Sequence, residues 1–288
     1  MGLFSVSTVT ADGVNIFYRS AGKETAPVIL LLHGFPSSSF MFRNVIPLLA
    51  TSYRVIAPDL PGFGFTEVPA ERSYRYTFAN LTKTTEAFID ALNIKRFTIY
   101  IFDYGAPTAL RLALKRPEAI SAIISQNGNA YVEGFGEDFW APIKKYWASG
   151  STTDRDALRS ALTFDVTKMQ YVKGSPHPSL IQPESYHLDQ ALMERPGNKD
   201  IQLDLFYDYR TNVDLYPKFQ EYFRSSDVPV LAVWGKNDAI FIPAGAKAFE
   251  QDVNHFELHF LDAGHFALET NELEMANSID RFLKKYVL

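Results

Sequence analysis

Strand-like and helix-like segments alternate along most of the chain, and this alternation restricts its fold more than any other feature. Short runs rich in β-branched and aromatic residues predict strands near residues 28–32, 53–57, 97–102, 119–125, 228–234 and 256–261. Helical patterns lie between them, and one helix face carries Phe78, Leu81, Thr85, Phe88 and Leu92. Such alternation favours an α/β fold with a mostly parallel sheet flanked by helices, whose active site lies at the carboxyl ends of the strands.

Two segments depart from this rhythm. Residues 4–10 and 14–20 alternate like an antiparallel pair around a tight turn. Between residues 125 and 228 the chain carries helical patterns without a convincing strand, over an interval too long for a loop. We expect a helical cap at residues 131–223, inserted into a core domain made of residues 1–130 and 224–288.

Composition excludes several classes of function. The 28 Lys and Arg residues against 33 Asp and Glu residues give a net charge of −5 without a basic run, so nucleic acid is not an expected partner. The longest aliphatic stretch, residues 28–32, is too short to span a membrane. The N-terminus lacks the pattern of a targeting or lipidation signal, so we expect a soluble, cytoplasmic protein. There is no cysteine, and His255 and His259 lie in a strand-like segment without a third ligand nearby, so no metal site is predicted.

Asp103 follows the predicted strand 97–102 and precedes a helical segment rich in Ala and Leu. A sharp turn between a strand and a helix can expose a nucleophile at the top of a sheet, so we expect a solvent-facing carboxylate there. A carboxylate attacks saturated carbon readily but is a poor nucleophile for acyl transfer. Asp103 therefore favours epoxides or alkyl halides as substrates over esters; the alternative is a structural helix N-cap.

Three further segments place candidate residues shortly after predicted strands, as Asp103 is placed. His265 follows the last predicted strand, from where an imidazole can reach Asp103 as a base. Asp238 follows the preceding strand and can accept the other imidazole N–H. After the strand 28–32, the backbone N–H of Phe35 can join that of Tyr104 as an oxyanion hole.

The motifs His33-Gly-Phe-Pro36, Ala57-Pro-Asp-Leu-Pro-Gly-Phe-Gly64, Asp103-Tyr-Gly105 and Gly264-His265-Phe266 together resemble those of the α/β-hydrolase superfamily over nearly the whole chain. The Asp nucleophile resembles the branch of epoxide hydrolases and haloalkane or haloacid dehalogenases. This resemblance implies that Asp103 forms a covalent ester with the substrate. A water activated by His265 then cleaves the ester while Asp238 stabilises the imidazolium. It implies no metal or organic cofactor, and a small apolar substrate as the partner.

The leaving group distinguishes the branches. Epoxide hydrolases use cap tyrosines as proton donors, one of them followed by Arg, which resembles Tyr209-Arg210. Haloalkane dehalogenases usually carry Trp after the nucleophile and Asn after the His-Gly pair, where this chain has Tyr104 and Phe35. Haloacid dehalogenases hold the substrate carboxylate with arginines near the nucleophile, and here the nearest is Arg111. These absences favour an epoxide.

One position departs from the epoxide hydrolase pattern. Trp140 stands where the first cap tyrosine is expected, and an indole N–H can bind a halide or orient an epoxide but cannot supply an acid proton. Tyr146 is a possible substitute, so Trp140 and Tyr146 are both predicted to contact substrate. We therefore expect an epoxide hydrolase, with a dehalogenase using the same triad as the alternative. A ligand-binding protein that retains the pocket without turnover is the alternative from another class.

Overall fold

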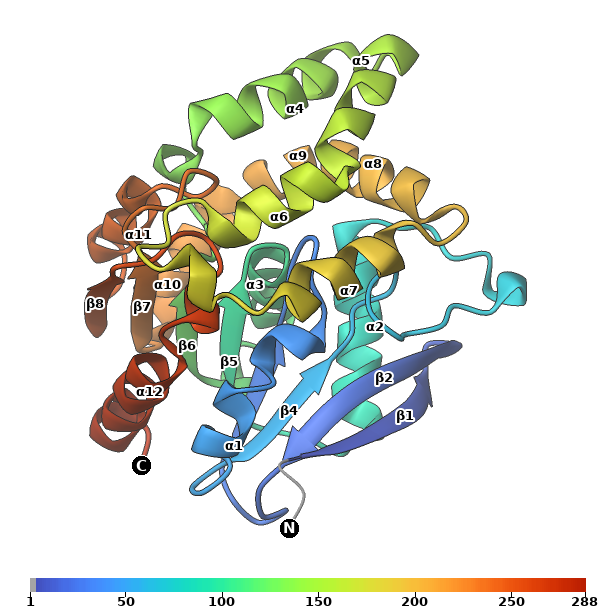
Figure 1. The fold of residues 1–288 in the computed structure, drawn as a ribbon. Coiled ribbons are helices and arrows are strands. Elements are labelled where there is room, and N and C mark those ends of the chain that lie inside the picture. Colours follow the sequence, from blue (N-terminus) through green and yellow to red (C-terminus); the bar gives the residue numbers. More distant parts are fainter. Residues whose placement is uncertain (1–3) are drawn as a thin grey trace.

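An eight-stranded sheet forms the centre of the computed structural model, which describes residues 4–288 (Figure 1). The first three residues, on which the expectation of an untargeted chain partly rests, lie outside this range. In spatial order the strands are β1 (Ser5–Ala11), β2 (Val14–Ala21), β4 (Arg54–Pro58), β3 (Val28–Leu32), β5 (Phe97–Phe102), β6 (Ile120–Gln126), β7 (Val230–Gly235) and β8 (Phe256–Leu261). β2 is antiparallel to β1 and β4, and all other neighbours are parallel. The predicted mostly parallel sheet is confirmed.

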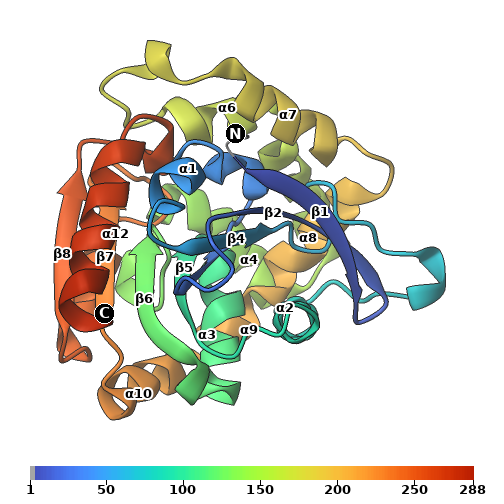
Figure 2. The same ribbon diagram turned by 90° about the horizontal axis from the view of Figure 1, so that it is seen from below.

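Each central strand is buried on both faces, because its side chains alternate between two hydrophobic clusters. In β5, Ile99 and Ile101 belong to one cluster, whereas Tyr100 and Phe102 belong to the other. The first cluster packs under α2 (Phe78–Ala91) and α3 (Gly105–Lys115), and the second under α1 (Val45–Leu49) and α12 (Glu272–Tyr286). Figure 2 shows α1 on one side of the sheet and α2 and α3 on the other. Helices on both faces explain why the central strands read as continuous apolar runs.

The interval between β6 and β7 is helical. Its helices are α4 (Glu137–Ser149), α5 (Thr152–Ala157), α6 (Phe164–Val172), α7 (Pro183–Met193), α8 (Asn198–Asp208), α9 (Arg210–Val213) and α10 (Tyr216–Ser226). Helices α4 to α9 lie over one end of the sheet (Figure 1). The predicted limit at residue 223 falls inside α10, which packs against α3. The division into a core and a cap at residues 131–223 stays a prediction, and "cap" is used below for that segment.

The short helix α11 (Pro243–Ala248) completes the α-helices and lies between β7 and β8. Within the described range of residues 4–288, none of the helices combines the length and apolar character needed to cross a membrane.

A buried ion pair within the core is contacted by the cap. Arg43 donates to both carboxylate oxygens of Glu269, at 3.0 and 2.8 Å, and the side chains are only 9% and 1% exposed. Ser185 of α7 donates to the same carboxylate at 3.1 Å, and Arg43 also donates to Gln182 at 3.2 Å. Since Glu269 follows His265 closely in the chain, these contacts connect α7 to the loop that carries the histidine.

We predict that Arg43→Met lowers the free energy of unfolding by about 3 kcal/mol, because Glu269 would stay buried without its countercharge. The matched control is Lys144→Met, which removes the exposed ion pair with Glu137 and should change stability by less than about 0.5 kcal/mol. Urea denaturation of both variants gives the two values. Equal, small losses would show that the buried pair contributes no more than the surface one.

Candidate active site

Asp103 occupies a sharp turn between β5 and α3. Its φ angle of +46° lies in the left-handed region, where a residue other than glycine is under backbone strain. The turn is crowded, because a Cβ atom on Gly34 would lie 2.4 Å from Oδ1 of Asp103. Only a glycine at position 34 lets the two loops approach this closely.

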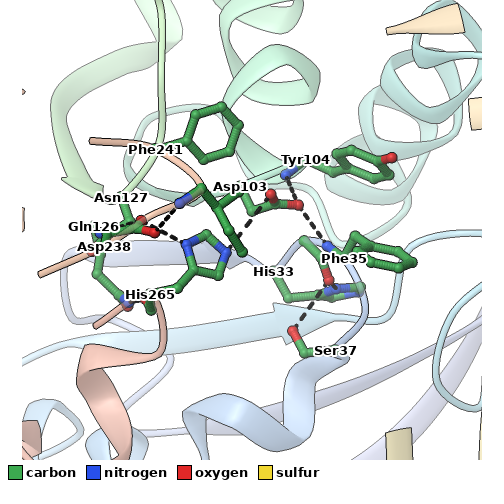
Figure 3. Close-up of polar contacts among 12 residues, drawn as sticks. His33, Phe35, Ser37, Asp103, Tyr104, Gln126, Asn127, Asp238, Phe241 and His265 are labelled. Atoms are coloured by element: carbon green, nitrogen blue, oxygen red, sulfur yellow. Dashed lines mark hydrogen bonds and ion pairs between the residues drawn. The ribbon is translucent and has the colours of Figure 1, made fainter. Parts of the chain in front are cut away.

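Two backbone N–H groups hold one oxygen of the Asp103 carboxylate. The N–H groups of Phe35 and Tyr104 donate to Oδ1 at 2.7 and 2.6 Å (Figure 3). These are the two groups that the sequence predicts as an oxyanion hole. Because both bind Oδ1, the second oxygen, Oδ2, remains available to a substrate.

His265 lies on the other side of this carboxylate, next to Asp238 (Figure 3). Its Nδ1 lies 2.8 Å from Oδ2 of Asp238, which fixes the proton on Nδ1. Its Nε2 lies 3.8 Å from Oδ2 of Asp103 and has no hydrogen-bond partner among residues 4–288. Asp238 is itself held by N–H groups of Asn127 and Ile240, both at 2.7 Å. The imidazole is therefore oriented with a free nitrogen beside Asp103.

The site is buried, contrary to the expectation that Asp103 faces solvent. Asp103 is 4% exposed and His265 is 2% exposed. Burial raises the pKa of Asp103 to about 6, although His265 and the two backbone N–H groups lower it. Burial alone would lower the pKa of His265, but Asp238 and Asp103 raise it above the ordinary value. Asp103 is thus mostly ionised at neutral pH, and it takes up a proton as the pH falls through about 6.

The cap residues predicted to contact substrate lie in different places. The ring of Tyr209 is 5.8 Å from that of Tyr104, and its hydroxyl lies 3.3 Å from that of Tyr216. The ring of Trp140 is 4.8 Å from that of Tyr209, but its indole N–H donates to the carbonyl of Ile240 at 2.9 Å. Any contact of Trp140 with substrate would come from its ring, and such a contact stays a prediction.

Tyr146 packs against another cap tyrosine. Its ring lies 4.7 Å from that of Tyr207, and its predicted contact with substrate stays a prediction. A tyrosine that the sequence analysis did not single out, Tyr216, lies beside Tyr209 instead.

Two asparagines after β6 have roles that the sequence analysis did not assign. Asn127 donates to Asp238 at 2.7 Å and accepts from the backbone N–H of Gly235 at 3.1 Å. Asn129 donates to the hydroxyl of Tyr216 at 3.4 Å. Their position at the carboxyl end of a central strand is the signal that identifies them as candidates.

No group of three or more His, Asp or Glu side chains in the described part of the chain is arranged to hold a metal ion.

Comparisons with known proteins identify the family of the chain. A family model described as the alpha/beta hydrolase fold matches residues 27–272. An uncharacterized hydrolase of Saccharomyces cerevisiae is 49% identical over 272 residues, which cover 93% of each chain.

Solved structures resemble this fold closely at low sequence identity. An epoxide hydrolase from Vigna radiata has a TM-score of 0.77 at 24% identity and covers 99% of each chain. A haloalkane dehalogenase from Bradyrhizobium elkani has a TM-score of 0.81 at 21% identity and covers 98% of each chain. The fold and the yeast relative support a hydrolase, and the chain belongs to the α/β-hydrolase fold family.

Proposed function

We propose that the protein hydrolyses an epoxide through a covalent ester on Asp103. In the first step, Oδ2 of Asp103 attacks a ring carbon while the bond from that carbon to the epoxide oxygen breaks. The departing oxygen takes the phenolic proton of Tyr209. Burial raises the pKa of Tyr209 well above 10, so this hydroxyl is protonated before the reaction begins.

In the second step, Nε2 of His265 takes a proton from water as the water attacks Cγ of the ester. Oδ1 is now the carbonyl oxygen, and the N–H groups of Phe35 and Tyr104 stabilise the negative charge that develops there. When the tetrahedral intermediate collapses, the bond from Cγ to Oδ2 breaks. Oδ2 leaves as part of the diol and receives the proton from His265. The second water proton restores Tyr209, so the enzyme returns to its starting state.

The hydrogen bonds already made by the indole N–H groups are the observation that favours an epoxide over a halide as substrate. All three indole N–H groups of the chain donate to backbone carbonyls: Trp140 to Ile240, Trp147 to Phe206 and Trp234 to Phe241. A halide would need such donors, whereas an alkoxide needs an acidic O–H. The hydroxyl of Tyr209 meets that need.

Arg111 bears on the haloacid alternative. Its guanidinium donates to the side chains of Asn212 and Thr211 at 2.8 and 2.7 Å, so it is engaged by α9. The binding of a substrate carboxylate beside Asp103 would require it to leave these partners.

Aromatic side chains around the triad favour an apolar substrate. The rings of Phe102 and Phe241 lie 4.6 and 6.1 Å from that of His265, and Phe35 packs against Tyr104. Apolar walls with a few placed polar groups are typical of sites for small apolar molecules. A small aryl or alkyl epoxide therefore suits this site.

His265→Gln should trap the ester, because the variant keeps the nucleophile but lacks the base for the second step. Intact-mass spectrometry after incubation with styrene oxides and bromoalkanes should show a mass increase equal to a whole epoxide. The control is the double variant Asp103→Asn/His265→Gln, which should stay unmodified.

An adduct equal to an alkyl group without its halide, formed in place of the epoxide adduct, would favour a dehalogenase instead. A protein that stays unmodified by both panels would contradict covalent catalysis and favour a ligand-binding protein.

Acidification should inhibit the two steps differently. Attack on substrate needs ionised Asp103, so the single-turnover alkylation rate should be constant at neutral pH and fall as the pH drops below about 6. Hydrolysis needs neutral His265, and Asp238 favours the protonated imidazole, so this step should slow with a midpoint of its own as the pH falls. Quenched-flow mass spectrometry measures both rates. An alkylation rate that stays constant down to about pH 4 would mean that Asp103 titrates like an exposed carboxylate.

A further inference from the structure

Three buried polar side chains lead from the loop after β6 to the proposed acid. Asn129 and Tyr209 have no exposed surface, and Tyr216 is 2% exposed. Asn129 donates to the hydroxyl of Tyr216 at 3.4 Å, and the hydroxyls of Tyr216 and Tyr209 lie 3.3 Å apart. By distance alone, the bond between the two phenols can run in either direction.

The orientation of the Asn129 amide is fixed by its other contacts. Its Nδ2 donates to the carbonyl of Tyr131 at 2.7 Å, and its Oδ1 accepts from the N–H of the same residue at 3.3 Å. A Cβ atom on Gly134 or Gly245 would lie 2.2 or 2.6 Å from Oδ1, so backbone encloses the amide tightly. The second N–H of Nδ2 is therefore the group directed at Tyr216.

This orientation sets the direction of the bond between the phenols. The oxygen of Tyr216 accepts from Asn129, and the only other hydrogen-bond partner of this hydroxyl within residues 4–288 is the hydroxyl of Tyr209. The oxygen of Tyr209 is therefore the acceptor for the proton of Tyr216. The proton of Tyr209 then has no acceptor among the hydrogen bonds of residues 4–288. A buried O–H normally finds a partner. The ring of Tyr209 packs 5.8 Å from that of Tyr104, the residue that follows Asp103, so the oxygen of a substrate bound at Asp103 can supply the missing acceptor.

We propose that Asn129 and Tyr216 are positioning residues that direct the proton of Tyr209 toward the substrate. This inference rests on the proposed epoxide hydrolysis. When the bond from carbon to the epoxide oxygen breaks, the proton of Tyr209 passes to that oxygen and a phenolate is left. The O–H of Tyr216 stabilises this phenolate, while Asn129 prevents Tyr216 from turning its proton away.

The hydrogen bonds that lead from Asn129 through Tyr216 to Tyr209 are called the relay below. Tyr216→Phe tests the relay with a change that keeps the ring. It should lower the single-turnover rate of alkylation by an epoxide about tenfold, the effect of one lost hydrogen bond to a developing charge. Hydrolysis of the ester should be unchanged, because His265 performs that step. The loss should be smaller for epoxides with electron-withdrawing substituents, whose oxygen leaves more easily. The matched control is Tyr222→Phe, a buried tyrosine on the same helix outside the relay, which should alter neither rate.

A second variant tests the direction of the bonds. In Asn129→Asp, above the pKa of the introduced carboxylate, Tyr216 should donate to the carboxylate and Tyr209 to Tyr216, so alkylation should fall further than in Tyr216→Phe. Adding Tyr216→Phe to Asn129→Asp should then increase the alkylation rate, because Tyr209 regains a free proton. If Asn129 and Tyr216 were only structural, the double variant should alkylate more slowly than Asn129→Asp. Thermal melting of each variant checks that the fold is intact.

The relay is overturned if Tyr216→Phe and Tyr222→Phe alkylate at the same rate, or if the double variant is no faster than Asn129→Asp. Should Asn129→Asp fail to fold, the comparison of the two tyrosine variants decides alone. If no epoxide alkylates the wild-type protein, the proposed function is overturned, and the relay with it. That result is obtained before any relay variant is made.

Discussion

Two backbone N–H groups share one oxygen of Asp103, and the rest of the site depends on this contact. It fixes the carboxylate so that Oδ1 is held and Oδ2 faces His265 at 3.8 Å from Nε2. The same two donors that orient the nucleophile before the reaction lie where negative charge would develop during ester hydrolysis. The contact requires the loops after β3 and β5 to approach closely, which the parallel pairing of these strands and Gly34 permit.

The helices over the site change its electrostatics. They bury Asp103 and His265 almost completely, so each charge is poorly hydrated and responds strongly to its neighbours. The pKa of Asp103 rises to about 6 for this reason. The ion pair between Arg43 and Glu269, with its link to Ser185, connects the same helices to the loop of His265. The stabilising ion pair and the proposed catalytic residues thus lie in one buried region between α7 and the carboxyl ends of the strands.

The sequence predicts those features that follow from local periodicity and from strand ends. The eight strands follow from apolar runs and alternation, and Asp103, Asp238 and His265 meet because the carboxyl ends of parallel strands share one edge. Features of the cap depend on packing between helices, which has no local signature. The ring of Tyr146 packs against that of Tyr207, whereas the hydroxyl of Tyr216 lies beside that of Tyr209, although Tyr146 and Tyr216 are both cap tyrosines. The indole N–H of Trp140 is bound by a main-chain carbonyl, an acceptor that residue identities do not reveal.

The origin of the product oxygen tests covalent catalysis by Asp103 most directly. With the enzyme in excess over an epoxide in ¹⁸O-labelled water, the first turnover should give a diol whose oxygen at the attacked carbon is unlabelled, because Oδ2 of Asp103 supplies it. Many turnovers should then introduce the label, as water replaces that oxygen in the carboxylate. A diol fully labelled at the attacked carbon in the first turnover would mean that water attacks the substrate directly and that Asp103 acts as a base.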